Sequence, residues 1–194
     1  MNKFKIIILI IGILFFTFLF LIGSVVGIVQ LLFMLAVYFF KKPLRFALRS
    51  ITERDFVLVV IFGTIFGLVE EILWYVFDPE IYWSSLFIDL TSMLPVYFTF
   101  YIVVYFLAKK FRVTQKKAFL SGGIFGYIFY FIAESGLFGF QIGGISEAPI
   151  LLIAIWEINN FFLNGLLVWF PLYVSNLLID ANKNQTKIWH NLFI

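Results

Sequence analysis

Five carboxylate side chains fall inside strongly apolar stretches of this sequence, where acidic residues are rare. They are Glu70, Glu71, Asp89, Glu134 and Glu157. A single ionised carboxylate in hydrocarbon costs at least about 2.5–3.5 kcal/mol. Because no Lys, Arg or His is expected at the depth of these residues, their charge needs another form of compensation. Bound protons, a hard divalent cation with oxygen ligands, or a cationic substrate would each supply it.

Three amide side chains extend this candidate site. Gln30 is expected at nearly the same level as the carboxylates, whereas Asn164 is expected nearer mid-depth. Asn160 and Asn164 share a helix face with Glu157, because the three positions are spaced i, i+3, i+7. We therefore expect the carboxylates and amides together to bind a ligand or protons. The candidate metal ligands among them are Glu71, Glu134 and Glu157.

The composition indicates that these residues belong to a membrane protein. The 194 residues are 63% hydrophobic and only 13% charged, against about 45–50% apolar and about 25% charged in a soluble domain. Such values exclude both a water-soluble globule and a disordered chain. With no cysteine and only one histidine, His190, the sequence excludes disulfides, iron–sulfur clusters and haem held by paired histidines. It also lacks nucleotide-binding motifs and a nucleic-acid-binding basic stripe.

Six apolar segments with the length of a membrane-spanning helix follow one another along the chain. Such a helix needs about 20 mostly apolar residues, within about 17–25. The predicted spans are 6–22, 24–40, 56–77, 86–108, 118–140 and 150–174. The sequence thus predicts an all-α, polytopic membrane protein, a six-helix transmembrane bundle that forms a single domain over residues 1–194. The alternative for residues 1–23 is a cleaved signal peptide, which would remove the first span.

All fourteen Lys and Arg residues fall on one side of this predicted topology. They occupy the N-terminus, the connections 41–55 and 109–117, and the tail 175–194. Since basic residues are retained on the cytoplasmic side, we expect a cell-membrane protein with both termini in the cytoplasm. The connection 41–55 also carries apolar residues at helical spacing, which predicts a short interfacial helix between the second and third spans.

The third and fifth predicted spans read alike. Residues 61–77 (IFGTIFGLVEEILWYVF) and 124–140 (IFGYIFYFIAESGLFGF) share seven of seventeen positions, and Glu71 aligns with Glu134. A parallel repeat of two helical hairpins would explain this match, and chance identity in an apolar chain is the alternative. The two candidate hairpins are 56–108 and 118–174.

Small residues share helix faces with two of the glutamates, at a spacing of four residues. The two stripes are Gly63, Gly67 and Glu71, and Gly122, Gly126, Tyr130 and Glu134. Small residues mark the faces on which membrane helices pack closely. We therefore expect both glutamates to point into the bundle rather than toward lipid.

Three classes of function remain open on these residues. The first is a transport or binding protein for a cation, protons or a small cationic solute, in which the carboxylates are ligands or proton carriers. The second is an intramembrane enzyme acting on a lipid or isoprenoid, with one protonated glutamate as general acid. The third is a structural or assembly subunit whose carboxyl groups only bond helices together.

We favour the first class, and so lean toward a protein that is not an enzyme. The predicted spans contain no continuous polar path through the membrane, which argues against an open aqueous channel. The expected partners are the lipid bilayer, a small solute or cation, and protein partners or further copies of this chain, but no nucleic acid. A divalent cation is the candidate cofactor; haem, nucleotides and iron–sulfur clusters are excluded as above. No motif identifies a family.

Overall fold

The computed structural model describes residues 25–77, 85–134 and 150–179, together with positions 10, 12, 13 and 17. The described helices are α2 (Val25–Ile51), α3 (Asp55–Phe77), α4 (Leu86–Phe111), α5 (Gln115–Glu134) and α6 (Ile150–Ser175). Within these ranges there is no strand, and an isolated bridge joins Thr114 to Ile179. The predicted all-helical class is confirmed.

Three of the described helices are long and apolar enough to cross a membrane. They are Gly27–Ile51 within α2, the whole of α3 and the whole of α4, with mean hydropathies of 1.4, 2.3 and 1.7. α3, α4 and α6 begin and end within three residues of the spans predicted at 56–77, 86–108 and 150–174. Only four positions of the predicted span 6–22 are among the described residues. The last part of the predicted span 118–140, residues 135–140, lies outside them. The count of six spans stays a prediction.

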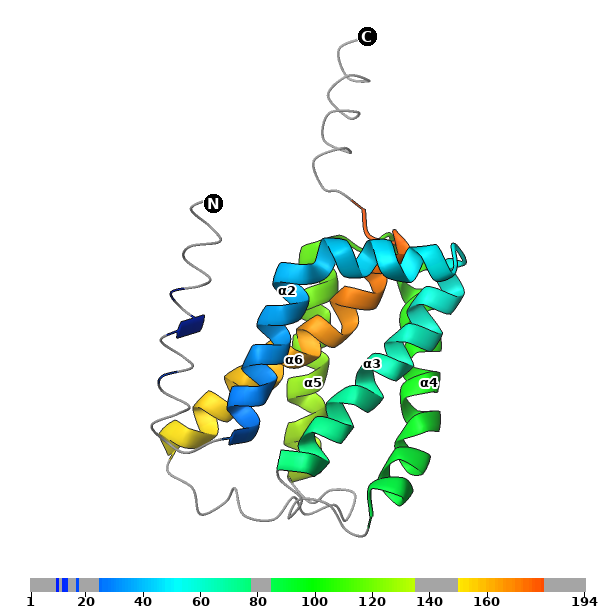
Figure 1. Cartoon of the computed structure of the whole chain (residues 1–194). Helices are drawn as coiled ribbons and strands as arrows, with labels where there is room; N and C mark the ends of the chain where they lie inside the picture. Colours follow the sequence, from blue (N-terminus) through cyan, green and yellow to red (C-terminus); the bar gives the residue numbers. More distant parts are fainter. Residues whose placement is uncertain are drawn as a thin grey trace.

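α2 is longer than the span expected at 24–40. It continues to Ile51 without a break, so the separate interfacial helix expected in the connection is the last part of the same helix. Pro43 lies inside α2 and cannot donate to the carbonyl of Phe39, which bends a helix. Figure 1 shows the C-terminal part of α2 (light blue to cyan) turning across the end of the bundle.

The basic residues gather at one end of the bundle, at the top of Figure 1. At this end α2, α4 and α6 finish, and α3 and α5 begin. We term it the basic end, and its residues are Lys41, Lys42, Arg45, Arg49, Arg54, Lys109, Lys110, Arg112, Lys116 and Lys117. These are all the Lys and Arg residues in the described ranges. The charge segregation expected along the helices is therefore present in this part of the structure.

Arg49 joins three helices at the basic end. Its Nη1 atom donates a hydrogen bond of 3.1 Å to the carbonyl of Val174, near the end of α6. The same atom lies 3.5 Å from Oδ1 of Asp55, the first residue of α3. Both contacts also suit the helix dipoles, because a cation lies at a C-terminus and a carboxylate at an N-terminus.

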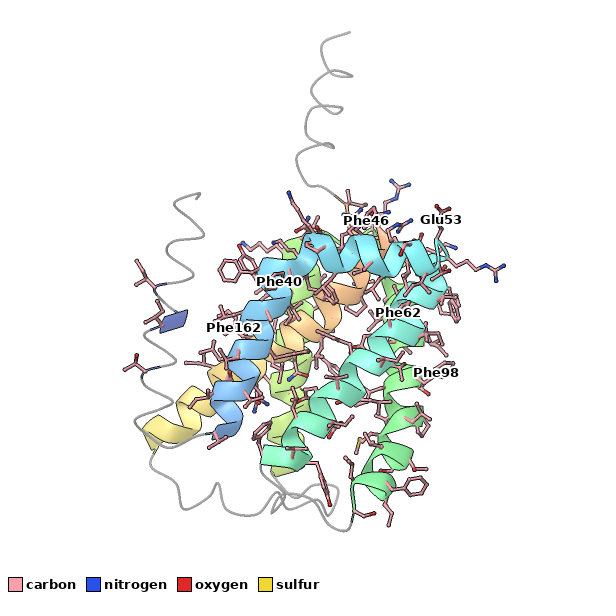
Figure 2. The ribbon with its side chains drawn as sticks, in the orientation of Figure 1. Phe40, Phe46, Glu53, Phe62, Phe98 and Phe162 are labelled. Carbon is pink, nitrogen blue, oxygen red and sulfur yellow. The ribbon has the colours of Figure 1, made fainter. Side chains whose placement is uncertain are left out.

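α6 is the central helix of the described bundle. It contacts α2, α3, α4 and α5, and almost all of its residues from Leu163 to Ser175 are buried. α3 pairs with α4, and α5 pairs with α6. Large aromatic side chains also point outward, as Phe46 on α2 and Phe98 on α4 do in Figure 2. An apolar exterior of this kind suits contact with lipid.

Candidate functional site

Two glycines of α3 make room for two tyrosines of α4. A Cβ atom placed on Gly63 would lie 2.5 Å from Cδ1 of Tyr101, and one on Gly67 would lie 2.6 Å from Cδ1 of Tyr97. Both distances are far shorter than a carbon–carbon contact of about 3.5–4.0 Å. Only glycine therefore allows the two rings to lie against α3, and the face that carries Gly63 and Gly67 faces α4.

The hydroxyl group of Tyr97 bridges the two adjacent glutamates of α3. Its oxygen lies 2.7 Å from Oε1 of Glu71 and 3.1 Å from Oε2 of Glu70. Glu70 is 4% exposed, and Glu71 is half-buried. A phenol has one proton, so Tyr97 donates to one carboxylate at a time. The other contact is a hydrogen bond only when that carboxyl group carries a proton and donates it to the phenol oxygen.

The hydroxyl group of Tyr101 donates to a backbone carbonyl of α6 rather than to a side chain of α3. Tyr101 is fully buried, and its hydroxyl donates a hydrogen bond of 3.0 Å to the carbonyl of Leu167 on α6. In a regular helix this carbonyl would accept from the backbone N–H of residue 171, but residue 171 is a proline and has no N–H. Tyr101 therefore supplies the donor that Pro171 removes, and it links α4 to α6.

Three buried amide side chains come from two contacting helices, α2 and α6. Gln30, Asn159 and Asn160 are 1%, 1% and 0% exposed, and Nδ2 of Asn159 donates to Oε1 of Gln30. Four of their polar atoms have no hydrogen-bond partner in the described part of the chain: Gln30 Nε2, Asn159 Oδ1, Asn160 Nδ2 and Asn160 Oδ1. Each such atom costs about 1–3 kcal/mol when it is left unsatisfied. The cluster thus favours a polar occupant, either water or a small solute.

The amides and the glutamate pair lie at one level of the bundle. The rings of Phe33 on α2 and Phe66 on α3 are 5.0 Å apart, which sets the register of these antiparallel helices. One turn further from the basic end are Gln30 on α2 and Glu70 on α3. Since Asn159 contacts Gln30, α6 contributes to the same level. We term this group the polar level: Gln30, Glu70, Glu71, Tyr97, Asn159 and Asn160.

The glycines of α5 serve a close approach to α6. A Cβ atom on Gly122 would lie 2.6 Å from the backbone oxygen of Asn164, and one on Gly126 would overlap the Asn164 side chain. Nδ2 of Asn164 donates to the carbonyl of Asn160 at 2.9 Å. Asn164, predicted as a ligand, therefore packs against α5, and its side-chain N–H group donates to a carbonyl of its own helix. Gly63 and Gly126 align in the candidate repeat but meet different residue types, Tyr101 and Asn164, and the duplication stays a prediction.

Three of the predicted carboxylates cannot be compared with the structure. The side chains of Asp89, Glu134 and Glu157 lie outside its described part, although the backbones of these residues fall in α4, α5 and α6. Two of the three candidate metal ligands belong to this group. Among the described residues, no three His, Cys, Asp or Glu side chains are placed to hold a metal ion.

Two members of the polar level, Tyr97 and Asn159, are not among the residues that the sequence predicts for the site. A signal for Tyr97 exists, because Tyr97 and Tyr101 repeat the four-residue spacing of Gly63 and Gly67. Asn159 is adjacent to a predicted residue, but its partner is in α2, far away in the sequence.

Comparisons of this chain with protein-family models, with curated proteins and with solved structures found no match.

Proposed function

We propose that this chain is a multi-pass membrane protein that binds protons, a small cation or a small polar solute at the polar level of its bundle. The observation that carries the proposal is the contact of one hydroxyl group, that of Tyr97, with both Glu70 and Glu71. Two carboxylates that share one hydrogen-bond donor repel each other when both are ionised. A proton on one of them, or a cation beside them, removes this repulsion.

The buried amides support the same function through their unsatisfied atoms. Gln30 Nε2 and Asn160 Nδ2 are donors, whereas Asn159 Oδ1 and Asn160 Oδ1 are acceptors. A water molecule or a small solute with both donors and acceptors would satisfy them. Because these atoms lie at the level of Glu70, one occupant network could connect the amides to the glutamate pair.

An enzyme that acts on lipid would need its carboxyl group beside an apolar groove. Two apolar cavities in the described residues, of about 640 and 420 Å³, are lined by neither Glu70 nor Glu71. Neither of these two cavities would therefore bring a lipid to the glutamate pair.

The proposal includes the finer topology that the sequence predicts. It places six spans in the membrane and both termini in the cytoplasm, with the basic end on the cytoplasmic side and the polar level in the outer half. The gathering of all described Lys and Arg residues at one end supports this orientation. The candidate repeat, 56–108 and 118–174, and the candidate metal ligands Glu71, Glu134 and Glu157 remain part of the proposal.

Thermal unfolding of the purified protein in lipid nanodiscs tests the proposal. Na⁺, K⁺, Mg²⁺, Ca²⁺, Mn²⁺ and a series of pH values are compared for wild type and for the double variant Glu70→Gln, Glu71→Gln. A ligand that binds the folded state raises the melting temperature, so we expect a response in wild type that the double variant loses. The control is Glu53→Gln, an exposed carboxylate outside the helices. A double variant that responds to every ion and pH as wild type does would refute the proposal.

A further inference from the structure

A large apolar cavity lies among α2, α5 and α6, away from Glu70 and Glu71. Its volume is about 640 Å³, which is within the range of about 300–1,000 Å³ for small-molecule sites. Its walls are mostly hydrocarbon, with Leu31 and Leu35 from α2, Leu120 from α5 and Leu166 from α6. The cavity can therefore accept the apolar part of a ligand.

Two lysines lie at the end of this cavity nearest the basic end. Nζ of Lys41 lies 4.2 Å from the ring centroid of Tyr38 and 5.4 Å from that of Trp169. Such cation–π contacts hold an ammonium group in place at the mouth. Lys116, the second residue of α5, also lines the cavity. The N-terminus of α5 adds the positive end of a helix dipole, and no Asp or Glu is among the described lining residues.

The cavity is elongated along the helix axes. On α2 its lining runs from Leu31 to Lys41, and on α6 it runs from Ile158 to Trp169. Ten residues of helix rise about 15 Å. A ligand that fills the cavity is thus extended and apolar over most of its length, with a negative charge at one end.

We propose that this cavity binds an anionic membrane lipid, with one acyl chain between α2 and α6 and its phosphate group at Lys41 and Lys116. The two lysines and the N-terminus of α5 complement the phosphate. A zwitterionic lipid has a compensating positive charge and gains less from them. Asn159 borders both this cavity and the polar level. The inference still does not depend on the proposed function, because it rests on Lys41 and Lys116 and neither lysine belongs to the polar level.

Lipid titrations of the full-length protein in detergent test the inference. The probes are phosphatidylglycerol, phosphatidylcholine with the same acyl chains, and glycerol 3-phosphate without chains; the readout is the melting temperature. One lysine near a phosphate contributes about fivefold in affinity, so we expect wild type to bind phosphatidylglycerol about 25-fold more tightly than phosphatidylcholine. Equal binding of the two lipids would overturn the proposal, as would an equal shift with glycerol 3-phosphate alone.

Neighbouring lysines provide a control with the same change in charge. The test variant is Lys41→Gln with Lys116→Gln, and the control variant is Lys42→Gln with Lys117→Gln. Lys42 and Lys117 are exposed and do not line the cavity. We expect the test variant to lose the preference for phosphatidylglycerol and the control variant to keep it. Equal loss in both variants would show nonspecific attraction to the basic end and would overturn the proposal. If the test variant fails to fold, the comparison of the three probes on the wild-type protein still tests the proposal.

Discussion

The hydroxyl group of Tyr101 donates a 3.0 Å hydrogen bond to the carbonyl of Leu167, whose helical donor is missing at Pro171. Three distant parts of the chain meet in this contact. Gly63 on α3 provides the space for the tyrosine ring, α4 supplies the hydroxyl group, and Pro171 leaves the acceptor open on α6. A buried carbonyl in a membrane protein needs such a partner, because neither water nor lipid can supply one.

Replacing Tyr101 by Phe should lower the free energy of unfolding by about 1 kcal/mol, the scale of a hydrogen bond within a membrane bundle. Pro171→Ala restores a backbone N–H that can donate to Leu167, so Tyr101→Phe should cost less in that background. The measurement is a double-mutant cycle by chemical unfolding in mixed detergent. Additive effects of the two substitutions would contradict the account.

Gly67→Ala should displace the ring of Tyr97, because the new Cβ atom would lie 2.6 Å from Cδ1. We expect a loss of stability of about 1–3 kcal/mol from this overpacking and a weaker response to ions and pH. Gly12→Ala is the control, since its Cβ atom would meet Leu35 at 3.4 Å. The measurements are the melting temperature and its response to ions for both variants. Equal melting temperatures and equal ion responses of the Gly67→Ala and Gly12→Ala proteins would contradict the close contact between Gly67 and Tyr97.

The sequence predicts the all-helical class and the positions of several helices, because these helices are long apolar segments whose ends are marked by charge. The bounds of α3, α4 and α6 follow from this pattern. The continuity of α2 does not, because Pro43 and the adjacent lysines resemble a break, although a bent helix accommodates them. Within the site, the burial of Glu70 and its contact with Tyr97 depend on which helices are neighbours, and residue types along one segment do not determine that.

The buried amides should reduce the stability of the protein when no ligand is bound. Asn160→Leu removes two unsatisfied polar atoms and keeps the number and branching of the side-chain heavy atoms, so we expect the free energy of unfolding without ligand to rise by about 1–2 kcal/mol. The same substitution should abolish stabilisation by a solute that occupies the polar level. Unfolding with and without the effective ion or solute measures both effects. A variant that is less stable than wild type in the absence of ligand would show that Asn160 has a structural role.

Arg49→Gln should loosen the basic end by removing the contacts with Val174 and Asp55. Because the two side chains of the ion pair are 27% and 39% exposed, we expect a small loss of about 0.5–1 kcal/mol. The loss should shrink at high salt, as screening weakens the ion pair. Arg54→Gln is the matched control, and unfolding at low and high salt is the measurement. The same loss in both variants would contradict a specific role for Arg49.

The most direct test of the central claim is infrared detection of a protonated carboxyl group at the Glu70–Tyr97–Glu71 bridge. Spectra are recorded in bilayers at neutral pH, in a buffer without inorganic cations, for wild type, the Glu70→Gln, Glu71→Gln double variant and the Glu53→Gln control. We predict a carboxylic acid carbonyl band in wild type and in the control that the double variant loses and that Tyr97→Phe shifts. No difference between wild type and the double variant in this band would mean that neither glutamate holds a proton, and it would contradict the account.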